Sequence, residues 1–249
     1  MQKRILLVLA FILSVGWYAY AQTKPTTYVI VHGAWGGSWA FKKTDSLLTA
    51  QGHTVYRPSL TGQGERVHLA SESVNLSTHI NDVVNTILFE ELKDIVLVGH
   101  SYGGMVITGV ADRVPDRIRK LIYLDAFVPN DGESVKSIQG PGFERMMAMS
   151  KDGMLVPPWV KADQPYPRDV PHPLNTLTEP LSLKNAAAKK LPAVYILTVD
   201  PGKKPEEDSF FTSSQRAKQK GWKVLEMSAD HNPQWSKVEE LAQLLNANK

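Results

Sequence analysis

The sequence has 249 residues, a length at which an α/β sheet protein folds as one domain around a single core. It contains no cysteine, which excludes a disulfide framework, a thiolate metal site and a lipoprotein anchor. Removing a predicted leader that carries Lys3 and Arg4 leaves 26 Lys and Arg against 25 Asp and Glu, a balance that gives no electrostatic basis for binding nucleic acid or an anionic membrane.

Residues 1–21 have the pattern of a secretory signal peptide. The two cations just named precede an apolar run over residues 5–15, and Ala19-Tyr-Ala21 is a small-x-small cleavage site. A membrane anchor is the alternative, but glycine and tyrosine dilute the end of the apolar run. We therefore expect a mature domain over residues 22–249 without a stable membrane anchor, exported to the periplasm or the outside of the cell.

The first strand is predicted over residues 27–31, and it runs into the segment His32-Gly-Ala-Trp-Gly-Gly37. Small residues after a strand leave backbone N–H groups free at the carboxyl edge of a sheet, which is what an oxyanion hole requires. We expect Ala34 to supply one such donor, with Trp35 as the neighbouring possibility. His32 is expected to bond the loop backbone rather than a metal.

Strands and helices then alternate along the chain. Apolar spacing predicts helices and strands in turn, with Ser38 capping the first helix and Gly52 ending it. Alternation of this kind predicts a doubly wound, mostly parallel sheet that binds ligands at the carboxyl ends of its strands. The helices are expected over residues 38–50, 77–91, 206–220 and 233–246, and the later strands over residues 54–57, 94–98, 120–124, 193–197 and 223–227.

The segment Gly99-His-Ser-Tyr-Gly103 is interpreted as a nucleophile elbow. It follows an apolar strand and precedes a helical stretch, and glycines two residues before and after Ser101 fit the tight turn that lifts a serine hydroxyl off a strand. The backbone N–H of Tyr102 is expected to face a developing oxyanion, helped by the positive end of the helix dipole. An ordinary turn with an idle serine is the alternative, and the strand-turn-helix context favours the nucleophile.

From residue 129 to about residue 190 the alternation stops. A long stretch without periodicity inside a compact domain is typical of a lid or a disordered insert. Its methionine and aromatic content favours a lid over an apolar substrate. The residues expected to shape the substrate pocket are His100, Met105 and Trp159, together with Met146 and His172.

A base and an acid are needed to activate the serine. His231 lies four residues after the last predicted strand, in a loop at the same sheet edge as Ser101. Two residues are candidates for the acid, because Asp125 lies at the end of one predicted strand and Asp200 follows the next. Both strand ends face the site, so the topology alone does not choose between them.

Five segments together resemble the α/β-hydrolase superfamily, within it the small esterases related to plant methyl-salicylate esterases and hydroxynitrile lyases. The likeness runs from residue 27 to the end of the chain except in the lid. It implies the α/β-hydrolase fold, with the lid inserted after the sixth strand of the usual scheme, and the chain order of nucleophile first and histidine last. The segments are Val31-His-Gly-Ala-Trp35, Leu60-Thr-Gly-Gln-Gly-Glu-Arg66, Gly99-His-Ser-Tyr-Gly-Gly104, Tyr123-Leu-Asp-Ala-Phe-Val-Pro129 and Asp230-His231.

The resemblance also bears on the acid. Haloalkane dehalogenases and some bacterial relatives carry it in a Tyr-x-Asp/Glu-Ala setting similar to Tyr123-Leu-Asp-Ala126. Asp200 is followed by Pro201-Gly-Lys-Lys-Pro205, which departs from the usual acid loop. We therefore favour Asp125, with Asp200 as the alternative acid.

The sequence thus predicts an exported serine hydrolase that cleaves a carboxylic ester through an acyl-enzyme, without a cofactor or a metal. One alternative is the same chemistry on a macrolide lactone ring, since bacterial serine macrolide esterases are also similar. Another is a hydroxynitrile lyase, which needs a lysine near the site, and Lys203 and Lys204 are the nearest by sequence. A non-catalytic binding protein of the same fold is the third. The expected partner is a small-molecule ester or lactone, whose acyl and alcohol parts do not follow from the sequence.

Overall fold

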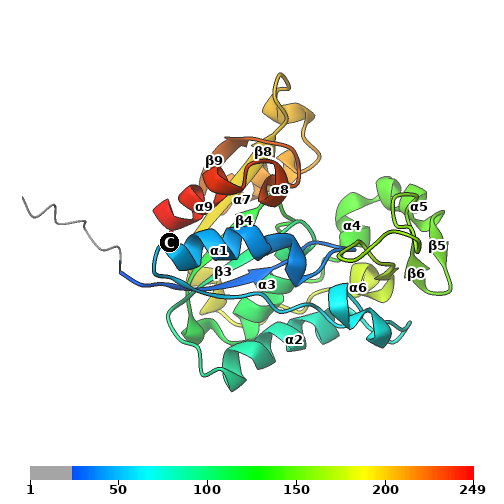
Figure 1. Ribbon diagram of the computed structural model, residues 1–249, viewed down its shortest axis with the longest axis horizontal. Helices are drawn as coiled ribbons and strands as arrows, with labels where there is room; N and C mark the ends of the chain where they lie inside the picture. Colours follow the sequence, from blue (N-terminus) through cyan, green and yellow to red (C-terminus); the bar gives the residue numbers. More distant parts are fainter. Residues whose placement is uncertain (1–23) are drawn as a thin grey trace, which may run out of the picture.

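A computed structural model describes residues 24–249, so the predicted signal peptide lies outside the described residues. Its centre is a six-stranded sheet in which every neighbouring pair of strands is parallel, as the alternating sequence pattern predicts (Figure 1). Across the sheet the strands run in the order β2 (Thr54–Tyr56), β1 (Thr27–Val31), β3 (Ile95–His100), β4 (Ile118–Leu124), β8 (Ala193–Val199) and β9 (Lys223–Ser228).

Helices cover both faces of this sheet (Figure 1). On one face, α1 (Lys42–Ala50) and α9 (Val238–Ala247) pack Leu48 and Leu241 against side chains of the central strands. On the other face lie α2 (Leu76–Phe89), α3 (Gly103–Arg113) and α7 (Phe211–Gln219). All six residues of β3 are buried between the two helix layers, which explains its unbroken apolar run.

Some element boundaries differ from the sequence predictions. Ser38 does not cap α1, because a 3-10 turn, η1 (Ser38–Phe41), comes first and α1 begins without a side-chain cap. The backbone N–H of Ser38 instead donates to Ser59 Oγ at 2.8 Å. Pro205 begins the short turn η5 (Pro205–Glu207), so the helix expected from residue 206 is α7 alone. The last predicted helix is divided into α8 (Pro233–Ser236) and α9.

The predicted lid, residues 129–190, lies between β4 and β8 in the chain, and much of it extends from one end of the molecule (Figure 1). It contains short regular elements that are too brief to show a periodicity in the sequence. Phe143 and Leu155 are buried and join the hydrophobic core on the α2 and α3 side, so the lid is a folded extension of the domain. Its elements are α4 (Val135–Gln139), α5 (Pro141–Met147), α6 (Asn175–Thr178) and an antiparallel sheet of β5 (Ser150–Lys151), β6 (Met154–Leu155) and β7 (His172–Pro173). Across residues 24–249, no helix combines the length and the apolarity that crossing a membrane requires.

Helix α3 packs closely against its neighbours through glycines. A Cβ atom at Gly104 would lie 2.2 Å from the carbonyl oxygen of Phe127, in the loop after β4. A Cβ atom at Gly109 would lie 2.3 Å from Cδ1 of Ile80 on α2. The end of an isoleucine side chain can rotate away, whereas a backbone carbonyl moves only with its loop. Gly104 therefore fixes the distance between α3 and the loop that carries Asp125.

We predict that Gly104→Ala lowers the free energy of unfolding by about 3 kcal/mol, because overpacking against a backbone group exceeds the gain of about 1 kcal/mol in helix propensity. Gly109→Ala is the matched control, expected to change stability by less than about 1 kcal/mol. Urea unfolding of both variants, with the slope checked for constancy, measures the difference. Equal losses in the two variants would contradict this account.

Candidate active site

Ser101 lies in a sharp turn between β3 and α3. Its φ of 54° is in the left-handed region, which costs a non-glycine residue about 1 kcal/mol or more. A Cβ atom at Gly99 would lie 2.7 Å from the carbonyl oxygen of Gly103, and one at Gly103 would lie 2.7 Å from that of Val31. The turn therefore has no room for a side chain at either glycine, as the G-x-S-x-G spacing predicts. It leaves the Ser101 hydroxyl at the carboxyl edge of the sheet.

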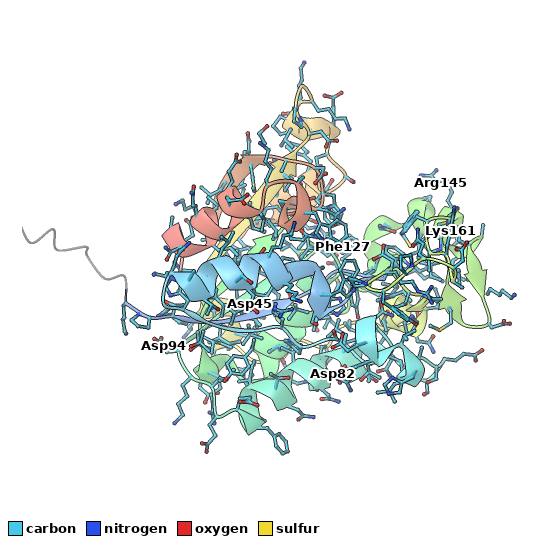
Figure 2. All side chains as sticks on the ribbon, in the orientation of Figure 1. Asp45, Asp82, Asp94, Phe127, Arg145 and Lys161 are labelled. Carbon is cyan, nitrogen blue, oxygen red and sulfur yellow. The ribbon has the colours of Figure 1, made fainter. Side chains whose placement is uncertain are left out.

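His231 reaches the serine from the loop after β9. Its Nε2 lies 3.0 Å from Ser101 Oγ. The imidazole stacks on Phe210 with ring centroids 5.0 Å apart and planes within 4°, and Phe210 packs edge-on against Phe127, which lies between the sheet and the lid (Figure 2). His100 donates from Nε2 to the carbonyl oxygen of His231 at 2.8 Å. Both the ring and the backbone of His231 are therefore held in position.

Asp125 is the carboxylate that contacts His231. Its Oδ2 lies 2.6 Å from His231 Nδ1, and its side chain is 0% exposed. The other carboxylate oxygen accepts from the backbone N–H of Thr198 at 3.2 Å. A carboxylate only accepts hydrogen bonds, so Nδ1 carries the proton and Nε2 is free to accept one from Ser101.

Asp200, the alternative acid, makes a different contact. Its side chain is 42% exposed and forms an ion pair of 2.6 Å with Lys203 Nζ. The same ion pair engages Lys203, one of the two lysines that were nearest by sequence for a lyase mechanism. Of the two carboxylates that the sequence left open, Asp125 is thus the one that the fold brings to His231.

Two backbone N–H groups near Ser101 make no hydrogen bond to another group of the described chain. Over the part of the chain that the structure describes, neither Ala34 nor Tyr102 donates its backbone N–H to another protein group. The N–H of Trp35, the neighbouring possibility, donates to Nδ1 of His172 at 3.3 Å. Of the two expected donors on the loop after β1, Ala34 is therefore the one left free to meet a substrate oxygen.

A cavity of about 180 Å³ lies beside Ser101 and His231. Among the expected pocket residues, His100 and Trp159 line it. Met105 does not, because its side chain is buried in the hydrophobic core on the α2 and α3 side of the sheet, and Met146 packs in part against the same core. His172 is fully buried behind Trp35 rather than exposed to the cavity.

Sequence reasoning missed several residues of this cavity. Asp169, Gln234 and Trp235 line it, and Trp39 lines an adjoining cavity of about 480 Å³. These residues lie in loops and short turns that carry no motif. One signal was available, since four of the six tryptophans in the chain, at positions 35, 39, 159 and 235, gather at this edge.

The buried histidines around the site are neutral at pH 7. Burial lowers the pKa of His32 to about 4, and that of His79 and His100 to about 3. His32 contacts the backbone of Gly33 and Leu60, the loop role expected for it. In the region from residue 24 to residue 249, no group of three or more His, Asp or Glu side chains is arranged to hold a metal ion.

Comparison with known proteins identifies the family. Residues 28–244 match the model of the alpha/beta hydrolase family. The chain belongs to this family. A carbendazim hydrolyzing esterase from Nocardioides sp. (strain SG-4G) is 40% identical to this hydrolase over 240 residues, which cover 88% of the chain and 98% of that protein. An alpha-hydroxynitrile lyase from Arabidopsis thaliana is 31% identical over 104 residues, 41% of the chain and 40% of that protein.

A solved structure supports the same grouping. An extracellular alpha/beta-hydrolase from a Paenibacillus species, which shares structural and functional homology to Tobacco Salicylic Acid Binding Protein 2, is 28% identical to the chain. Its TM-score is 0.75, and the match covers 89% of this chain and 98% of that one. The predicted α/β-hydrolase fold and the resemblance to the esterase and lyase branch are confirmed. This alpha/beta hydrolase is a carboxylic ester hydrolase.

We predict that Asp125→Asn lowers kcat for ester hydrolysis by about 10⁴-fold, because an amide in place of the carboxylate favours the wrong tautomer of His231. Asp200→Asn is the matched control and should change kcat by less than about twofold, since exposed ion pairs contribute little. Steady-state kinetics on one activated ester measure both. A larger loss in the Asp200 variant would reverse the assignment of the acid.

The stability of this hydrolase should depend on pH. Because the folded pKa values of His32, His79 and His100 lie below the unfolded value of about 6.5, the unfolded chain binds more protons below that pH. The free energy of unfolding should therefore fall as the pH drops from about 6.5 towards 4, by up to about 1.4 kcal/mol per pH unit for each histidine. Urea unfolding at pH 7 and pH 5 tests this, and His79→Gln should flatten the slope. Equal stability at the two pH values would contradict it.

Proposed function

We propose that this alpha/beta hydrolase is an exported serine esterase that cleaves small carboxylic esters with Ser101, His231 and Asp125. The observation that carries the proposal is the continuous contact from the buried carboxylate through the imidazole to the hydroxyl, with successive distances of 2.6 and 3.0 Å. A serine hydroxyl is a weak nucleophile until a base with a fixed tautomer takes its proton. These three side chains can meet that requirement.

In the proposed reaction, Ser101 Oγ attacks the ester carbonyl carbon while His231 Nε2 takes the hydroxyl proton. The imidazolium is stabilised by Asp125, and the negative oxygen accepts from the N–H groups of Ala34 and Tyr102, each worth about 3 kcal/mol in such sites. The intermediate expels the alcohol, which receives the proton from His231. Water then attacks the acyl-enzyme with His231 as base, and the carboxylic acid leaves Ser101.

Two observations favour hydrolysis over the lyase alternative. The described residues that line the cavity beside Ser101 include no lysine, and Lys203 is paired with Asp200. The Nocardioides relative is named for hydrolysing carbendazim, so that compound and simple methyl esters are the first substrates to test. The macrolide lactone ring stays a prediction from the sequence resemblance.

Export is part of the same proposal. It rests on the basic start, apolar run and small-x-small site over residues 1–21. The lack of cysteine fits it, because a domain with a core of this size needs no disulfide in an oxidising compartment.

We predict that Ser101→Ala lowers turnover by about 10⁴-fold or more while the circular dichroism spectrum is unchanged. Purified mature protein would be screened by mass spectrometry on methyl and aryl esters, carbendazim and macrocyclic lactones, with the alanine variant as the blank. A fluorophosphonate probe should label the wild type at Ser101 and leave the variant unlabelled. Retained turnover in the variant would refute the mechanism, and silence of the wild type on all substrates would favour a binding protein.

A further inference from the structure

Asp169 is a carboxylate of the lid that faces the proposed catalytic cavity. It lines both the cavity beside Ser101 and the adjoining cavity of about 480 Å³. Across residues 24–249 no charged partner accompanies it, and burial alone raises the pKa of its carboxyl group. The neighbouring Arg168 is engaged elsewhere, since its guanidinium donates to the carbonyl of Gln164 and lies 4.7 Å from the ring centroid of Tyr166. The Asp169 carboxylate at the cavity therefore forms no ion pair with another described residue.

The backbone beside Asp169 is anchored to the loop that carries Ala34. Val170 donates its N–H to the carbonyl oxygen of Trp35 at 2.9 Å, and Trp35 donates its own N–H to His172 at 3.3 Å. The side chain of Gln63 donates to the carbonyl oxygen of Pro171 at 3.0 Å. These bonds hold the segment 169–172 beside the reacting groups. The backbone that carries Asp169 is therefore held at the cavity.

Two indole rings line the same cavities as this carboxylate. Trp159 and Trp235 line both cavities with Asp169 and remain 52% and 47% exposed. Trp159 packs edge-on against Trp35 at 5.5 Å, and Trp235 stacks on Trp39 at 5.6 Å. Indole faces carry a negative quadrupole and attract cations, so the rings and the carboxylate favour the same sign of ligand charge.

The other titratable groups at the cavity do not offset this charge. His32 and His100 are neutral at pH 7 because burial lowers their pKa values to about 4 and about 3. His231 contacts the buried Asp125. The described lining of the cavity beside Ser101 includes no Lys or Arg. Arg168 lines the adjoining cavity, but its guanidinium donates to the carbonyl of Gln164 and lies over the ring of Tyr166 rather than pairing with Asp169. An acid in a partly dry site is costly without a partner, and a substrate cation would supply one.

We propose that Asp169, Trp159 and Trp235 form a subsite for a positively charged nitrogen of the substrate, a protonated or quaternary ammonium group. The inference rests on the proposed ester hydrolysis at Ser101 and names the esters that this site selects. The ester carbonyl lies at Ser101, and the cation of the acyl or alcohol part lies between the indole rings and the carboxylate.

The test compares acetylcholine with its uncharged carbon isostere, 3,3-dimethylbutyl acetate. Wild-type enzyme should have a kcat/KM about tenfold higher for the cationic ester, the scale of a partly desolvated cation–π contact. Asp169→Asn should bring the ratio of the two kcat/KM values close to one, and Trp159→Leu should lower it in part. Asp163→Asn, on the exposed part of the same lid, is the matched control and should keep the wild-type ratio.

Binding is measured separately from turnover. Choline, followed by tryptophan fluorescence, should bind to Ser101→Ala and bind at least about tenfold more weakly to the double variant with Asp169→Asn. A wild-type ratio at or below one, a ratio that survives Asp169→Asn, or choline binding indifferent to that change would each overturn the subsite. Hydrolysis of neither ester, together with no fluorophosphonate labelling of Ser101, would refute the proposed function instead, and the choline measurement would still decide the subsite.

Discussion

The left-handed backbone of Ser101 is the constraint on which this end of the molecule depends. Two hydrogen bonds join it to the end of β4 and the loop that follows, from Ser101 N–H to the carbonyl of Leu124 and from Phe127 N–H to the carbonyl of Ser101, both at 3.2 Å. Leu124 and Phe127 flank Asp125 and Ala126 in the chain. The contacts that stabilise the strained turn therefore also position the carboxylate of Asp125, so the strain at Ser101 and the placement of this carboxylate have one structural solution.

Buried histidines connect the segments around this turn. A neutral imidazole can donate from one nitrogen and accept at the other, so a single side chain can join two loops. His32 contacts the loop after β1 and the N–H of Leu60, and His79 bridges the hydroxyl of Tyr102 and the carbonyl of Thr61. Burial lowers the pKa of both rings, because a charged imidazole is unfavourable in a core of low dielectric constant. A protonated ring would also lose the nitrogen that accepts a hydrogen bond. Hydrogen bonds of these buried histidines therefore connect the loops around the site within an otherwise apolar core.

Much of the fold could be predicted because its signals are local. The apolar strands, the glycines around Ser101 and the position of His231 after the last strand follow from spacing alone. Spacing alone could not distinguish the two candidate acids, because Asp125 and Asp200 each follow a strand at the same edge of the sheet. Only the fold shows that Lys203 is held against Asp200.

Other residues were out of reach for different reasons. Met105 was expected in the pocket, but the face that α3 turns to the core depends on how the helix packs, not on its own periodicity. Asp169 reaches the cavity from an irregular segment and Trp235 from the four-residue helix α8, and the regular elements of the lid have two to seven residues. Segments this short have no period to detect, and tertiary contacts alone bring their side chains to the site.

The hydrogen bonds between the lid and the loop after β1 limit which lids this chain can carry. Trp35 bonds the lid through both its N–H and its carbonyl, and it is the next residue after Ala34. The lid is therefore not an exchangeable module in this chain. A lid inherited or grafted from another protein would have to bring acceptors and donors matched to Trp35, or it would displace the loop on which the proposed oxyanion donor Ala34 lies.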